Sequence, residues 1–205
     1  MFRSILSFVL VILYACVAFG QIAGTDHDFS GQGWGTTEIC EPCHAPHNSD
    51  LTVSDAPLWN HEVTAATFTV YSSTTLNATV GQPSSNSKLC LSCHDGTVAL
   101  DSFGGNTGTN FISGSALIGT DLSNDHPVSF VFNAALATAD GGLYDPSTHI
   151  TALGGTIEED LLFGLSGSAT LECASCHDPH NGYGNPHLLL IDNDASAFCL
   201  TCHDK

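Results

Sequence analysis

The sequence has very little positive charge. Its 205 residues hold three lysine or arginine side chains against 21 aspartates and glutamates, which gives a formal net charge of −18. Phosphate backbones and anionic lipid surfaces repel a chain this acidic, so nucleic acid and membrane surfaces are poor candidates for partners. Cationic partners, metal ions and mineral surfaces remain compatible with the charge.

Long apolar segments are also scarce, and the one that stands out lies at the start. Arg3 precedes a largely apolar stretch over residues 5–19. This pattern is typical of a secretory signal peptide, so we expect residues 1–20 to be cleaved after Gly20. The mature protein would then be extracellular or at the cell surface, or alternatively periplasmic. A lipoprotein site at Cys16 is a second interpretation, which the aromatic Tyr14 fits poorly. No other segment is long enough for a membrane helix.

Regular secondary structure is the third feature in short supply. Amphipathic helical periodicity is nearly absent, and the spacers are rich in Gly, Ser, Thr, Asn and Asp, which favour loops and turns. Short β-like runs occur at 67–71 and 128–132, and residues 81–88 and 104–115 are predicted to be exposed connections. Ordinary side-chain packing therefore offers too little for a convincing core, so something else must fill the middle of the molecule.

What the sequence does have is cysteine in pairs, each followed at once by a histidine. The pairs are Cys40 and Cys43, Cys90 and Cys93, Cys173 and Cys176, and Cys199 and Cys202, and the histidines are His44, His94, His177 and His203. Cys-x-x-Cys-His is the attachment motif of c-type haem, in which both cysteines form thioethers and the histidine binds the iron. A disulfide framework or structural zinc would also use paired cysteines, but neither requires a histidine after every pair.

The sequence thus predicts four covalently bound haems c in one domain over residues 21–205. At this density the porphyrins themselves supply the apolar core, and they must lie close together. We expect a haem-packed multihaem cytochrome fold that is mostly irregular, with short helices at the haem motifs and a few short β-strands.

The sixth ligand of each iron decides between electron transfer and catalysis. Seven histidines lie outside the motifs, whereas the single methionine is the initiator, so we predict bis-histidine ligation. Because histidine is in surplus, no iron needs an open position, and we expect no enzymatic activity.

Local context ranks the distal candidates. His47 and His180 each follow a motif histidine by three residues, which is too short a segment to reach the opposite face of the same haem. Each is therefore expected to bind a neighbouring haem. Pro127 holds His126 at the start of a strand-like run, and His61 lies near Trp59 in the sequence. The distal candidates are His126, His180, His47, His61 and His27, while His149 and His187 rank below them.

The motif pattern occurs twice. "CEPCHAPHN" at 40–48 nearly matches "CASCHDPHN" at 173–181, and each is followed by a second motif, "CLSCHDG" at 90–96 and "CLTCHDK" at 199–205. This order predicts a duplicated two-haem unit, with copies at about 21–130 and 131–205.

With "PLWNHE", "CLSCHDGTVA" and "DHPVSF" added to these segments, the chain resembles the doubled Cys-x-x-Cys-His multihaem cytochromes. Among them it is similar to the exported tetrahaem cytochromes of metal-reducing bacteria that polymerise into extracellular filaments. The resemblance implies stacked bis-histidine haems, subunits joined end to end, and one haem per subunit that takes an axial histidine from its neighbour. The matching distal positions are His27, His47, His61, His126 and His180. Five candidates serve four positions, and the surplus one is expected to be His27 or His47, with His27 on a mobile N-terminal arm as a donor to an adjacent subunit.

Three functions follow from this pattern. The favoured one is an electron carrier that forms the repeating subunit of an extracellular conductive filament, with itself as its main partner and other cytochromes or extracellular acceptors as redox partners. The alternatives are a monomeric periplasmic tetrahaem shuttle and a small multihaem reductase with one open haem site.

Overall fold

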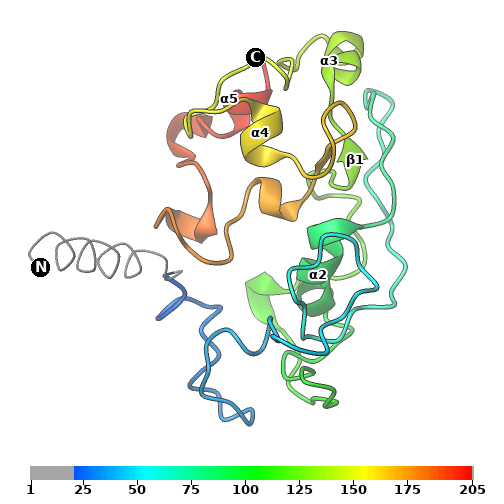
Figure 1. The fold of residues 1–205 in the computed structure, drawn as a ribbon. Helices are drawn as coiled ribbons and strands as arrows, with labels where there is room; N and C mark the ends of the chain where they lie inside the picture. The colour runs from blue at the N-terminus through cyan, green and yellow to red at the C-terminus, as the bar shows by residue number, and fades with distance from the viewer. Residues whose placement is uncertain (1–20, 205) are drawn as a thin grey trace, which may run out of the picture.

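The structure is a computed structural model that describes residues 21–204, and most of these residues lie in loops (Figure 1). The predicted signal peptide, residues 1–20, lies outside the described residues. The helices are α2 (Ser85–His94), α3 (Ala134–Asp140), α4 (Ile157–Leu161) and α5 (Cys199–Cys202), and the 3-10 turns are η1 (Gly114–Ala116), η2 (Cys173–Ser175), η3 (Pro186–Leu188) and η4 (Asp194–Ser196). The strands are β1 (Phe130–Val131) and β2 (Thr170–Leu171). The predicted fold class, mostly irregular with short helices and strands, is confirmed. Over residues 21–204, no helix has the length and apolar character needed to cross a membrane.

The two strands form one small antiparallel sheet. Phe130 lies opposite Leu171 and Val131 lies opposite Thr170, so the run predicted at 128–132 does contain a strand. The run at 67–71 forms only an isolated bridge, at Thr69. The side chain of Gln82 accepts a hydrogen bond from Phe68 N at 2.8 Å and donates one to Phe68 O at 2.9 Å. Because Gln82 occupies both backbone groups of Phe68, no strand can pair at Phe68 along the edge opposite to the Thr69 bridge.

Helix α4 begins at a capping box. Thr156 Oγ1 accepts from Glu159 N at 3.2 Å, and the Glu159 carboxylate accepts from Thr156 N at 2.9 Å. This reciprocal pair satisfies two donors that a helix start leaves free. Helix α3 begins at Asn133, whose side chain accepts from Leu136 N, and ends at Gly141 in a left-handed conformation with φ 69°.

The main apolar core lies around the C-terminal motifs. Its buried residues are Phe130, Phe132, Ala137, Ile157, Leu161, Leu171, Ile191 and Phe198. Cys176 and Cys202 pack against this cluster from two different motifs. A smaller cluster joins Phe68, Leu91 and Leu122. Side-chain packing therefore supports the third and fourth motifs directly.

Residues 81–88 are only partly the exposed connection that the sequence predicts. Helix α2 begins at Ser85, and both Ser85 and Ser87 are buried. The side chains of Asn86 and Ser87 accept hydrogen bonds from Ala174 N at 3.0 Å and Cys173 N at 2.9 Å. These polar residues are thus enclosed because they satisfy the backbone of η2. Residues 104–115 are largely exposed, as predicted.

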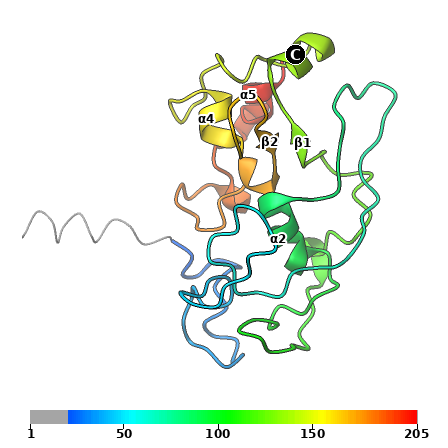
Figure 2. The same cartoon turned by 45° about the vertical axis from the view of Figure 1, so that its right-hand side comes forward.

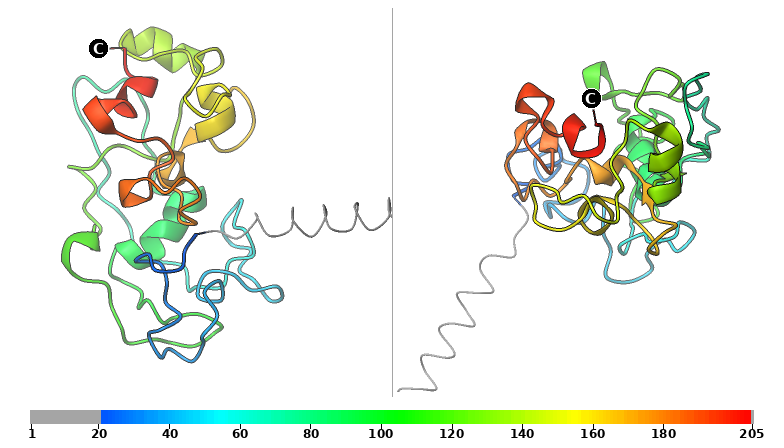
Figure 3. Two further views of the ribbon diagram at one scale, coloured as in Figure 1. Left: turned by 90° about the vertical axis from the view of Figure 1, so that its left-hand side faces the viewer. Right: turned by 90° about the horizontal axis from the view of Figure 1, so that it is seen from above.

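Helix α2 occupies the middle of the molecule. It lies between the N-terminal residues, coloured blue, and the part that carries α3, α4 and α5 (Figures 1 and 2). Helix α5 and the segment after α3 lie near each other (Figure 3, left), and Asp204 N donates to Gly142 O at 2.9 Å. The first and last motifs therefore lie on opposite sides of α2.

Candidate haem sites

Each motif folds into one tight turn. His44 N donates to Cys40 O at 2.8 Å, and the corresponding bonds from His177 N and His203 N measure 3.0 Å. The second motif lies in the last turns of α2, the third begins at η2 and the fourth forms α5. The same turn therefore brings two sulfur atoms and one imidazole to one place in every motif, as thioether attachment and proximal ligation of one haem require.

The four motifs are neighbours in chain order. A side-chain hydrogen bond to Cys173 of the third motif, together with burial, raises the pKa of Cys90 well above its usual range, and Cys43 of the first motif adds to the rise. Burial raises the pKa of Cys202 in the fourth motif to about 12, and Cys176 of the third motif contributes. Groups attached to successive motifs would thus be adjacent. In residues 21–204 no disulfide joins any of the eight motif cysteines.

The motif histidines present one particular nitrogen for metal binding. Nδ1 of His44 lies 2.6 Å from Pro57 O, Nδ1 of His94 lies 2.8 Å from Ala116 O, and Nδ1 of His177 lies 3.0 Å from His187 O. A carbonyl oxygen can only accept, so Nδ1 carries the hydrogen and Nε2 keeps its lone pair. This is the usual arrangement of a metal-binding histidine, whose second nitrogen donates to a backbone carbonyl or carboxylate.

Three motif histidines lie opposite a second histidine. The ring centres of His44 and His180 are 6.0 Å apart, those of His94 and His27 are 6.1 Å apart, and those of His203 and His126 are 6.4 Å apart. Two metal–nitrogen bonds of about 2 Å, plus ~1 Å from each nitrogen to its ring centre, place such centres about 6 Å apart. The spacing therefore fits an iron held between two imidazoles.

His27 lies close to a motif of its own chain, which differs from the expectation that it reaches an adjacent subunit from a mobile arm. Burial, and then the neighbouring His94, lower the pKa of His27. The unprotonated form that a metal requires is thereby favoured.

The remaining motif histidine, His177 of the third motif, has a different environment. All histidines of the chain fall within residues 21–204, and none of their rings forms a comparable pair with His177. The two remaining distal candidates, His47 and His61, lie elsewhere. Both line a cavity of about 630 Å³ beside Trp59, whose buried Nε1 has no hydrogen-bond partner.

His61 is the more enclosed of these two, with 3% of its surface exposed. Its Nδ1 lies 2.8 Å from Glu62 O, its Nε2 lies 2.9 Å from Ala99 O, and the same Nε2 lies 3.6 Å from Cys93 Sγ. Both nitrogens thus face backbone carbonyls, so His61 would have to release one of them to bind iron. His47 is exposed.

The two histidines ranked lowest have other contacts. The His149 ring stacks on Tyr144 with centres 3.8 Å apart and planes at 10°, and Tyr144 Oη donates to the Asp204 carboxylate at 3.2 Å. His187 contacts the third motif through its backbone carbonyl, which accepts a hydrogen bond from His177 Nδ1. Neither histidine lies opposite a motif histidine.

The asparagine that ends each repeated segment has a local role that the sequence reasoning missed. Asn48 and Asn181 both adopt left-handed backbone conformations, with φ of 59° and 55°. Asparagine tolerates this region better than most residues with a side chain. The signal was present in the sequence, because "HN" closes both copies of the segment.

A comparison with protein families supports haem attachment at the motifs in the C-terminal part of the chain. Residues 167–205 match the family model described as the doubled CXXCH motif. The match supports covalent attachment of haem c at the motifs of this part, as in multihaem c-type cytochromes, which serve electron transfer. Among curated proteins, no significant match to the chain was found.

Proposed function

We propose that this protein is a tetrahaem c-type cytochrome that carries electrons along a row of bis-histidine haems. The observation that carries the proposal is the continuous series of four attachment motifs, three of which have a second histidine about 6 Å from the motif histidine. When bound, each haem would supply one-electron chemistry. The chain's own residues would hold Nε2 toward the metal and keep neighbouring sites close together.

We further propose that the subunit assembles end to end into an extracellular filament after export. The support is the environment of His177, whose Nδ1–H is satisfied by His187 O but whose ring is not paired with a second histidine in residues 21–204 as the other three motif histidines are. His27 also lies near His177, but its ring is paired with that of His94. A histidine of the next subunit would complete that site. His47 is the side chain best suited to this role, because it is exposed and has no motif histidine opposite its ring. Enough histidines are present to fill the sixth position of every iron, and a filled position leaves no site for a substrate. We therefore propose that the protein is not an enzyme.

The experiment is to isolate the holoprotein from the cell surface and to compare it with His47→Ala. We expect four haems per chain by pyridine haemochrome assay and mass, filaments by electron microscopy, and only low-spin haem. His47→Ala should give shorter or no filaments and one high-spin haem in four. The matched control is His149→Ala, which should leave assembly and spectrum unchanged.

Two outcomes favour the alternatives. A uniformly monomeric native protein with four low-spin haems would support a periplasmic shuttle and overturn the filament. A high-spin haem in native filaments would support a reductase with an open site at His177.

A further inference from the structure

The two copies of the repeated segment differ at three positions, and one of these lies between the motif histidine and the second histidine. The first copy has Ala45 where the second copy has Asp178, so "CHAPHN" stands against "CHDPHN". An alanine offers nothing to a neighbouring imidazole, whereas a carboxylate can accept several hydrogen bonds. The hydrogen-bond partners of Asp178 therefore show what this difference does.

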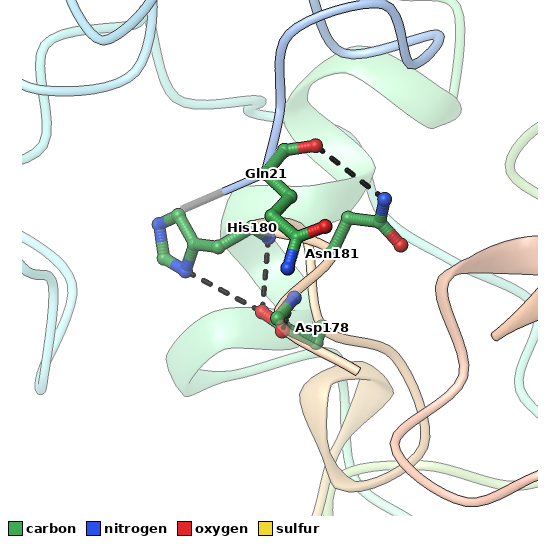
Figure 4. A network of polar contacts seen from close by, with 5 residues as sticks. Gln21, Asp178, His180 and Asn181 are labelled. Atoms are coloured by element: carbon green, nitrogen blue, oxygen red, sulfur yellow. Dashed lines mark hydrogen bonds and ion pairs between the residues drawn. The ribbon is translucent and has the colours of Figure 1, made fainter. Parts of the chain in front are cut away.

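Asp178 organises the turn that presents His180. Its Oδ1 accepts from His180 N at 2.9 Å, and its Oδ2 accepts from Gly182 N at 2.6 Å. Oδ1 also lies 3.5 Å from His180 Nδ1, as Figure 4 shows. The Asp178 side chain is 15% exposed and that of His180 is 52% exposed, so the carboxylate is shielded while the ring projects outward.

The turn is held from its other side by the start of the described chain. Asn181 Nδ2 donates to Gln21 O at 3.4 Å (Figure 4). A Cβ at Gly182 would lie 3.0 Å from Asp178 Oδ2, so a larger residue there would crowd the carboxylate. The result is a turn in which the direction of the His180 ring depends on Asp178.

The ring presented in this way lies opposite the first motif. The rings of His180 and His44 lie at 20° to each other with centres 6.0 Å apart. The Nδ1 atoms of His44, His94 and His126 face neutral backbone carbonyls, whereas His180 Nδ1 faces a carboxylate. The carboxylate places a negative charge 3.5 Å from the ring, which favours the more positive, oxidised metal in a way that a neutral carbonyl does not.

We propose that Asp178 is a positioning residue for His180, and that its carboxylate lowers the reduction potential of the haem attached at Cys40 and Cys43. This inference rests on the proposed function, because it requires a haem at the first motif. It assigns to the second copy of the repeat a role in tuning a haem of the first copy.

The test is redox titration of the holoprotein with Asp178→Asn, followed by absorbance and electron paramagnetic resonance. The amide keeps one of the two acceptor oxygens of the turn and removes the charge. We expect all haems to stay low-spin while one transition shifts about tenfold in its equilibrium constant toward the reduced state, about 59 mV for one electron. Asp178→Ala should cause the same shift and a high-spin fraction at one site.

The matched control is Asp121→Asn, because the Asp121 carboxylate closes a similar turn by accepting from Ser123 N at 3.1 Å. Its titration curve should superimpose on that of the wild type. Superimposed curves for Asp178→Asn, with four low-spin haems in the wild type, would overturn this inference and leave the proposed function standing. A wild-type protein without bound haem would refute both.

Discussion

His126 shows how a single residue is prepared for ligation. Its Nδ1 lies 2.9 Å from the carbonyl of Pro127, and its ring lies 6.4 Å from that of His203 at 78°. The carbonyl fixes the tautomer, so Nε2 is left for a metal. The fixed φ of the proline restricts the backbone that carries the ring.

We therefore expect His126→Ala to leave one iron five-coordinate. The absorbance and electron paramagnetic resonance spectra of the holoprotein should gain a high-spin signal from one haem in four, with the other three low-spin. His149→Ala is the control, since its ring stacks on Tyr144 instead. An unchanged spectrum for His126→Ala would remove this residue from the ligand set.

Among the structural elements, the junction of β2 and η2 depends on a buried acid. Glu172 is 0% exposed, and its carboxylate accepts from Ser129 Oγ at 2.8 Å, from Thr170 Oγ1 at 2.7 Å and from Ser84 Oγ at 3.5 Å. Ser84 immediately precedes α2 and Ser129 precedes β1. Glu172 thus ties the third motif to residues of the first copy.

Glu172→Ala should destabilise the holoprotein, because it leaves the buried Ser129 hydroxyl and the half-buried Thr170 hydroxyl without their acceptor. We expect the free energy of unfolding to fall by about 1–3 kcal/mol, measured by guanidinium denaturation followed with circular dichroism. Glu62→Ala, at an exposed position, should unfold at the wild-type denaturant concentration. Equal midpoints for both variants would show that the Glu172 contacts contribute nothing.

For the whole molecule, charge is the dominant property. After loss of residues 1–20, Lys88 and Lys205 would face 21 acidic side chains. Copies of such a chain repel each other, so end-to-end assembly requires a specific contact that outweighs the repulsion.

Salt should therefore promote assembly of the purified holoprotein. Raising the ionic strength from about 0.01 M to about 0.15 M shortens the screening length from roughly 30 Å to roughly 8 Å. We expect longer filaments at the higher salt concentration by light scattering and electron microscopy. Filaments that fall apart as salt is added would instead indicate that attraction between opposite charges holds the subunits.

The predictions for residues 81–88 and 67–71 failed for the same physical reason. Residues 81–88 look like a solvated linker, yet Ser87 is buried because it accepts from Cys173 N, a residue far along the chain. The run at 67–71 has strand composition, yet the Gln82 side chain takes both hydrogen-bonding groups of Phe68. In each case a polar side chain from another segment replaces a backbone partner, and composition does not report such contacts.

By itself the sequence determined the attachment chemistry and the irregular character of the fold. A Cys-x-x-Cys-His motif spans five residues, so its cysteines and histidine share one turn wherever it occurs. Tertiary structure alone decided which second histidine lies opposite which motif. His27 faces His94, His126 faces His203 and His180 faces His44, and these pairs join segments far apart in the chain. Only packing brings such distant residues together, because the short-range patterns of a sequence carry no record of which remote segments meet.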